Sequence, residues 1–152
     1  MENVYALTSR WEINTGRDEL WDVLEQLLAT TDPMPWWRSV QVVDNDGTVM
    51  NLKASSQLGY TLHFRLYELV ARRPDTLTFA SDGDLRGSGT MTFRSVGADA
   101  SALEFQWNVS AGRAWMRATS LVLRPLFVLG HHLVMAQGEK NLNAWLAKRG
   151  RA

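Results

Sequence analysis

Cysteine is absent from this chain of 152 residues, and neither sign of charge is in excess. Without a thiol, the protein has no disulfide, no thiolate zinc site and no cysteine nucleophile. The 16 basic and 16 acidic side chains cancel, so net charge gives no reason for attraction to nucleic acid or to an anionic membrane. We therefore expect no nucleic acid among its partners.

Long apolar runs are also missing. The longest, Leu126–Ala136, is interrupted by two histidines and is shorter than the roughly 20 residues that a membrane-spanning helix needs. Residues Met1–Arg10 lack the basic and then apolar pattern of a signal peptide. We expect a soluble cytoplasmic protein without stable membrane insertion, folded as a single domain over residues 1–152.

What the chain does have is a succession of alternating apolar and polar stretches, which are typical of strands with one face exposed. Clear turn signals separate several of them, such as Asp44-Asn45-Asp46-Gly47 and Asp82-Gly83-Asp84. The pattern predicts about seven strands: Tyr5–Ile13, Val40–Val43, Thr48–Ala54, Tyr60–Val70, Leu77–Ser81, Leu85–Val96 and Leu103–Ala111.

Helical patterns precede and follow the last six of these strands. Asp18 is a suitable N-cap for a helix that carries Leu20, Trp21 and Leu24 on one side. Near the end of the chain, a helical lead-in over Trp115–Arg124 precedes a long helix that has Pro125 in its first turn and ends near Lys148. Clustered strands between helices predict an α+β fold with an antiparallel sheet.

Several segments together resemble a known superfamily over about Tyr5–Leu146. They are the first strand with Trp11 and Ile13, Leu20-Trp21-Asp22-Val23-Leu24, Trp36-Trp37, Gly83-Asp84-Leu85-Arg86-Gly87, and His131-His132-Leu133-Val134-Met135 followed by Gly138-Glu139. The chain resembles the START/Bet v 1-like (SRPBCC) superfamily, in its polyketide cyclase/dehydrase and lipid-transport branch.

The resemblance implies a helix-grip fold, in which a curved antiparallel sheet of about seven strands wraps around a long C-terminal helix. One or two short helices would follow the first strand. Members bind lipids, sterols, polyketides, quinones or plant hormones in a hydrophobic cavity, and some catalyse cyclisation or dehydration there. The superfamily has no shared catalytic residue to carry over, so the resemblance implies a pocket and no particular reaction.

His131 is the sharpest candidate for a functional group. Helical spacing places it on one apolar stripe with Val134, Gly138, Leu142 and Trp145, which faces the sheet. Two interpretations stand: a histidine that orients a ligand or acts as an acid or base, and a buried histidine bonded to a strand carbonyl or an indole.

Other residues are weighed in the same way. His132 and His63 are expected at the periphery, and three scattered histidines do not suggest a metal site. Glu68 is in phase with the inward residues of its strand, which allows either a buried acid or an exposed ion pair with a neighbouring arginine. Trp36 and Trp37 are expected at the cavity mouth, beneath the first helix, or one at each.

Gly87 and Gly89 share one strand face, where glycine favours curvature or close approach of another group. With Gly138 on the helix, such small residues would set the width of the cavity. The residues expected to line the ligand site are Trp37, Phe64, Leu66, Met91, Phe93, Trp107, His131, Met135 and Gly138.

Three hypotheses for function follow. The first is binding, transport or sequestration of a small hydrophobic molecule such as a lipid, polyketide or quinone. The second is a cyclase or dehydratase that acts on a polyketide-like carbonyl compound, with His131 as acid or base and a group near pH 6 to 7 in its rate profile. The third is a quinone chaperone or protein-interaction module with a largely filled core. We expect no cofactor, and a monomer or homodimer.

Overall fold

The computed structural model describes residues 4–111 and 120–149, and the side chains of residues 6–110 and 128–149. Within these ranges seven strands form one antiparallel sheet in the order β1-β7-β6-β5-β4-β3-β2. The strands are β1 (Val4–Ile13), β2 (Val40–Asn45), β3 (Val49–Ser55), β4 (Thr61–Arg72), β5 (Thr76–Gly83), β6 (Leu85–Gly97) and β7 (Ala100–Ala111).

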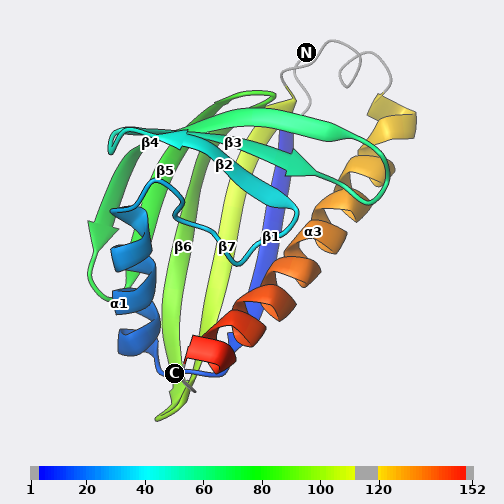
Figure 1. Ribbon diagram of the computed structural model, residues 1–152. Helices are drawn as coiled ribbons and strands as arrows, with labels where there is room; N and C mark the ends of the chain where they lie inside the picture. The colour runs from blue at the N-terminus through cyan, green and yellow to red at the C-terminus, as the bar shows by residue number, and fades with distance from the viewer. Residues whose placement is uncertain (1–3, 112–119, 150–152) are drawn as a thin grey trace.

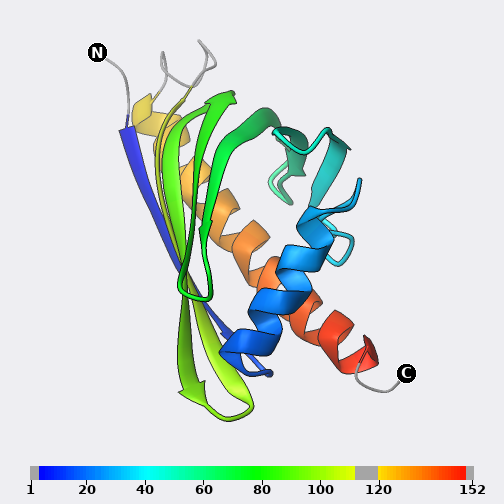
Figure 2. The same cartoon turned by 90° about the vertical axis from the view of Figure 1, so that its left-hand side faces the viewer.

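Two helices, α1 (Arg17–Leu28) and α3 (Ser120–Arg149), lie on the same side of the sheet (Figures 1 and 2). A curved antiparallel sheet around one long C-terminal helix is the helix-grip arrangement that the sequence predicts. Among the described residues, no helix combines the length and the apolar character needed to cross a membrane.

Short polar turns set the register of the meander. Between β2 and β3, the carboxylate of Asp46 accepts hydrogen bonds from the backbone N–H groups of Thr48 at 2.9 Å and Val49 at 2.8 Å. These bonds hold the pKa of Asp46 at about 2, below its usual 3.8. Gly47 supplies the positive φ of 93° that the tight turn requires.

A bulge in β4 decides which of its residues face the concave side. The register with β5 shifts between Tyr67 and Val70, and Glu68 adopts a φ of 52°. An uninterrupted alternation after Leu66 would turn Glu68 inward, whereas the bulge exposes Glu68 and turns Leu69 inward instead. Of the two interpretations of Glu68, the buried acid is therefore wrong, and the exposed position is found.

The first helix covers one end of the concave face. Its residues Leu20, Trp21 and Val23 are buried, and Arg73 in the β4–β5 turn pairs with Asp22 and Glu25 on its surface. The helix begins two residues earlier than expected, with Gly16 rather than Asp18 at its N-cap. Asp18 lies in the first turn, where an acidic side chain favourably meets the positive end of the helix dipole.

The last helix begins at Ser120, so Pro125 lies inside it. The sequence suggested instead that Pro125 would lie in its first turn. Its end at Arg149 agrees with the expected position near Lys148. Of the predicted helical lead-in, residues 115–119 lie outside the described residues.

Polar side chains of α3 satisfy backbone groups along both edges of the sheet. On the β1 edge, Glu139 accepts the backbone N–H of Glu12 at 2.7 Å, and Asn143 bonds to the backbone of Glu12 and Asn14 at 2.9 Å. Just before β2, Asn141 accepts the N–H of Arg38 at 3.2 Å. Because edge strands otherwise leave backbone groups unpaired, these bonds explain how one helix can hold a curled, open sheet.

Candidate ligand-binding cavity

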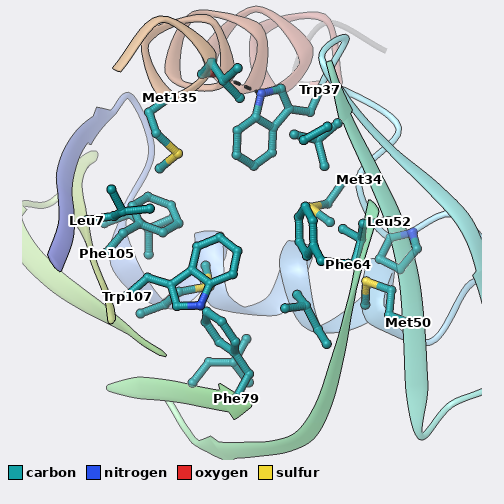
Figure 3. Close-up of a pocket in the computed structure, with 18 of the residues that line it drawn as sticks. Leu7, Met34, Trp37, Met50, Leu52, Phe64, Phe79, Phe105, Trp107 and Met135 are labelled. Atoms are coloured by element: carbon teal, nitrogen blue, oxygen red, sulfur yellow. Dashed lines mark hydrogen bonds between the residues drawn. The ribbon is translucent and has the colours of Figure 1, made fainter. Parts of the chain in front are cut away.

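A cavity of about 220 Å³ lies between the concave face of the sheet and α3. Figure 3 shows an open space with the indole of Trp37 on one side, that of Trp107 opposite, and Phe64 and Leu7 across from each other. Its wall is dominated by aromatic, leucine and methionine side chains. The cavity is therefore suited to an apolar guest.

Strand alternation directs these rings inward. On β7, the cleanest alternation in the sequence, Phe105 and Trp107 line the cavity. The ring centroid of Trp107 lies 5.4 Å from that of Phe64 on β4 and 5.7 Å from that of Phe79 on β5. Rings from three strands thus meet edge to face or tilted, in contacts that favour aromatic packing.

Two indole N–H groups in the wall are already satisfied by the protein. Trp107 Nε1 donates to the hydroxyl of the buried Ser81 at 3.1 Å, and Trp37 Nε1 donates to the Val134 carbonyl on α3 at 3.2 Å. Both rings are fixed in orientation by these bonds. They turn their apolar surfaces, and no free donor, toward the space between them.

The sequence left open whether Trp36 and Trp37 lie at the cavity mouth or beneath the first helix. Their rings stack with centroids 5.3 Å apart, and both pack edge-on against Trp11. Trp36 is 8% exposed and belongs to the packed core, Trp37 is only partly buried, and both border the cavity. The pair therefore joins the core to the cavity wall.

The small residues on the inner surface make room for the protein's own rings. A Cβ at Gly89 would lie 2.4 Å from the Phe79 ring, and a Cβ at Gly138 would lie 2.6 Å from Trp11 and 2.7 Å from Trp37. At Gly87 it would lie 1.9 Å from the backbone oxygen of Asn108 on the neighbouring strand. These glycines allow close packing, and they shape the cavity only through the rings that they accommodate.

His131 borders the cavity from α3. Its Nδ1 is buried and has no hydrogen-bond partner among the described residues. Burial, and to a smaller extent the adjacent His132, lowers the pKa of His131 from 6.5 to about 4, so the ring is neutral at pH 7. For Nδ1, the expected bond to a strand carbonyl or an indole is not found. His132 and His63 are exposed, as predicted.

A second polar group lies beside His131. Gly130, its neighbour on α3, faces the hydroxyl of Tyr60, and a Cβ there would lie 2.0 Å from that oxygen. Tyr60 and Ser56 come from the β3–β4 connection, line the cavity, and are joined by a side-chain hydrogen bond. Burial raises the pKa of Tyr60, which keeps its hydroxyl protonated. The cavity thus has one polar end within an aromatic wall.

Eight of the nine predicted residues lie in the cavity wall: Trp37, Phe64, Leu66, Met91, Phe93, Trp107, His131 and Met135. The ninth, Gly138, lies behind the wall against Trp11 and Trp37. Whether a ligand contacts these residues stays a prediction. Sequence reasoning missed several wall residues, among them Leu7, Met34, Met50, Leu52, Tyr60, Phe79 and Phe105. The same alternation that indicated Trp107 could have indicated Phe79 and Phe105.

Charge is nearly absent from the wall. No lysine or arginine lines the cavity among the residues whose side chains the structure describes. The one acid in the wall, Glu25, is exposed at the rim, where it accepts the indole N–H of Trp21 at 2.9 Å and pairs with Arg73. In residues 4–111 and 120–149, no group of three histidines or acids gathers closely enough to hold a metal ion.

No protein family model and no curated protein matches the sequence. Solved structures do. A START superfamily protein from Mycobacterium smegmatis matches with a TM-score of 0.63 at 12% identity, over 94% of this chain and 97% of that one. Norcoclaurine synthase from Thalictrum flavum, as a point mutant in complex with a transition state analogue, matches with a TM-score of 0.56 at 10% identity, over 97% and 98% of the two chains.

The aromatase/cyclase Zhui from Streptomyces sp. R1128 matches with a TM-score of 0.52 at 15% identity, over 92% of this chain and 96% of that one. Likeness at such low identity shows the fold alone. The chain has the START/Bet v 1-like helix-grip fold.

Proposed function

Starting from this helix-grip fold, we propose that the protein binds a small hydrophobic molecule, such as a lipid, polyketide or quinone, in the cavity between sheet and α3. The observation that supports this most strongly is the cavity of about 220 Å³, walled by rings whose indole N–H groups at Trp37 and Trp107 are already bonded. Binding against such a wall is favourable mainly because it removes apolar surface of the guest and of the wall from water.

The expected affinity follows from the area buried. A two-ring guest that loses roughly 300 Å² of apolar surface gains on the order of 7 kcal/mol at about 25 cal/mol per Å². Loss of translational and rotational freedom offsets part of this gain. A net gain of about 7 kcal/mol would correspond to about 10 μM, so after this loss we expect dissociation constants weaker than about 10 μM for simple aromatic probes.

The test uses N-phenyl-1-naphthylamine, an uncharged dye that brightens in apolar surroundings. The variant Leu66→Trp places a larger side chain in the cavity wall, and Val70→Trp places the same side chain on the same strand at a position that is 50% exposed. We expect the wild type and Val70→Trp to bind the dye with equal affinity. Leu66→Trp should bind it at least tenfold more weakly.

Equal dye affinity in all three proteins would show that the dye binds elsewhere, and absence of binding to the wild type would count directly against the proposal. Far-ultraviolet circular dichroism and thermal melting of each variant verify that the fold is retained. Mass spectrometry under non-denaturing conditions complements the titration, because a molecule that co-purifies would identify the natural ligand class.

A second candidate function, favoured by the imidazole of His131 in the cavity wall, is a cyclase or dehydratase. A ring with its pKa lowered to about 4 holds no extra proton to donate at pH 7 and is a weak base. The rate of such an enzyme would therefore fall only near pH 4, and not in the range of pH 6 to 7 expected for an ordinary histidine. Loss of turnover in His131→Gln on a polyketide-like substrate would support this function.

The third hypothesis, an interaction module with a filled core, is less favoured because the inward side chains leave open space. We propose a cytoplasmic protein, monomeric or homodimeric, that carries or sequesters its ligand. Sedimentation in the presence and absence of the dye tests its oligomeric state.

A further inference from the structure

The polar atoms of the cavity are distributed unevenly. Three cavity-lining side chains have a buried nitrogen without a partner among the described residues: Trp11, Trp36 and His131. The two indoles pack against each other with centroids 5.8 Å apart, inside the tryptophan cluster. His131 lies apart from that cluster, next to Gly130 and the Tyr60 hydroxyl, at the polar end of the cavity.

The imidazole constrains which group could meet it. A neutral imidazole has one nitrogen that donates and one that accepts, and a hydroxyl can do either. A hydroxyl on a guest can therefore bond to the ring in both tautomers. Leaving a polar group of the ring unpaired once a guest has displaced water is costly, so a guest that supplies this bond has an advantage over one that cannot.

The wall also discriminates against negative charge. It contains no lysine or arginine among the side chains described, and its one formal charge, that of Glu25, is negative and at the rim. His131 is neutral at pH 7 and offers no cation either. A carboxylate placed in the cavity would lose its hydration without gaining an opposite charge.

We propose that the cavity selects uncharged ring molecules that carry a hydroxyl, that this hydroxyl bonds to the imidazole of His131, and that carboxylates are rejected. The inference rests on the proposed function and specifies its ligand class: hydroxylated aromatic or polycyclic molecules rather than fatty acids or other anions. His131 is the residue that determines this specificity.

The test uses three probes with one ring system: naphthalene, 2-naphthol and 2-naphthoate, each displacing N-phenyl-1-naphthylamine at pH 7.5. In the wild type, we expect 2-naphthol to bind about tenfold more tightly than naphthalene, as one net hydrogen bond allows. We expect 2-naphthoate to bind at least tenfold more weakly than 2-naphthol.

His131→Leu should bring the affinity for 2-naphthol to within about twofold of that for naphthalene, and this variant should still bind naphthalene. Retained naphthalene binding shows that the variant is folded and that its cavity is intact. His131→Gln, which keeps a hydrogen-bonding group, should retain part of the preference. His63→Leu, the same change at an exposed position on β4, should leave all three affinities unaltered.

Two results would overturn the inference while the proposed function stands: 2-naphthoate binding as tightly as 2-naphthol, or a preference for 2-naphthol that persists in His131→Leu. Failure of the dye to bind, or unchanged dye binding in Leu66→Trp, would instead overturn the proposed function and the inference with it.

Discussion

The two ends of the concave face are built from the same inward alternation, yet one is filled and the other is hollow. At the end covered by α1, Ile13, Leu20 and Leu142 are at most 1% exposed. At the other end, Leu66, Phe79 and Trp107 also point inward but remain only partly buried, because they border the cavity. Alternation therefore decides which way a side chain points, and a second layer decides whether the space is filled.

Two features produce the difference. The helix α1 supplies Leu20, which belongs to one core cluster with Ile13 and Leu142. Its Trp21, with a ring centroid 4.9 Å from that of Phe93 on β6, lies where this cluster meets the cavity wall. At the hollow end, the bonds from Trp107 to Ser81 and from Trp37 to Val134 hold the two indoles apart. Because the two largest rings of its wall are fixed, we expect the cavity to persist in solution.

The largest expected effect comes from equal truncations at the two ends. Leu142→Ala should lower the free energy of unfolding by about 3 kcal/mol, because it opens a new cavity in a filled core. Leu66→Ala should lower it by about 1 kcal/mol, because the side chain already borders open space and loses less burial. Urea unfolding of both variants measures the difference.

Equal losses in the two leucine variants would contradict the distinction between a filled and a hollow end. Dye binding gives a second readout. Leu66→Ala enlarges the cavity and should alter the affinity for N-phenyl-1-naphthylamine, whereas Leu142→Ala should leave it unchanged.

The next effect concerns pH. The unfolded chain binds a proton at His131 below about pH 6.5, while the folded protein does so only near pH 4, so stability should fall as pH drops from 6.5 to 4. At 1.36 kcal/mol per pH unit this difference corresponds to about 3 kcal/mol, which partial exposure of the ring reduces to about 2 kcal/mol. His131→Leu should lack this part of the acid sensitivity.

Denaturant midpoints at several pH values between 4 and 7 check this expectation, with His63→Leu as the control. Other carboxylates also titrate in this range, so the informative quantity is the difference between wild type and variant. If the difference in stability between the wild type and His131→Leu does not change with pH, the imidazole is hydrated in the folded protein.

The smallest effect compares two glycines of α3. Alanine is favoured over glycine inside a helix by about 1 kcal/mol. At Gly138 the new methyl group would collide with two tryptophan rings, at 2.6 and 2.7 Å, and overpacking costs about 1–3 kcal/mol. At Gly130 it would lie 2.0 Å from the Tyr60 hydroxyl and 2.9 Å from the Ser56 hydroxyl, at the ends of two side chains.

We therefore expect Gly138→Ala to lower stability by about 1 kcal/mol net, and Gly130→Ala to leave it nearly unchanged. Gly130→Ala should instead weaken binding of 2-naphthol, because Tyr60 is displaced at the polar end. Thermal melting measures the stability changes, and dye displacement measures the binding of 2-naphthol. A larger loss of stability in Gly130→Ala than in Gly138→Ala would contradict this expectation.

The comparison also explains what could be predicted from sequence. Alternation and turn residues, such as Asp46-Gly47, predicted the strands within a few residues, because register depends on local patterns. The bulge at Glu68 was not predicted, since an extra residue in one strand depends on its pairing with β5. A helical lead-in before Pro125 was expected, but its continuity with α3 was not, because proline is usual in the first turn of a helix and disrupts the hydrogen bonding of its interior.

The candidate site was predicted in part for the same reason. Inward residues of strands, such as Phe64 and Trp107, follow from period-two alternation, and eight of nine predicted residues lie in the wall. The polar end was not predicted, because Tyr60 and Gly130 are 70 positions apart and meet only when the β3–β4 connection packs on α3. The state of His131 also depends on burial, which spacing alone does not set.

The most direct test of the account is a crystal structure of the protein with 6-bromo-2-naphthol, in which anomalous scattering locates the bromine without ambiguity. We predict one bromine peak in the cavity between Trp37, Phe64 and Trp107, with the hydroxyl within hydrogen-bonding distance of His131. A bromine peak only on the outer face of the sheet, or side chains that close the space between these rings, would contradict the account.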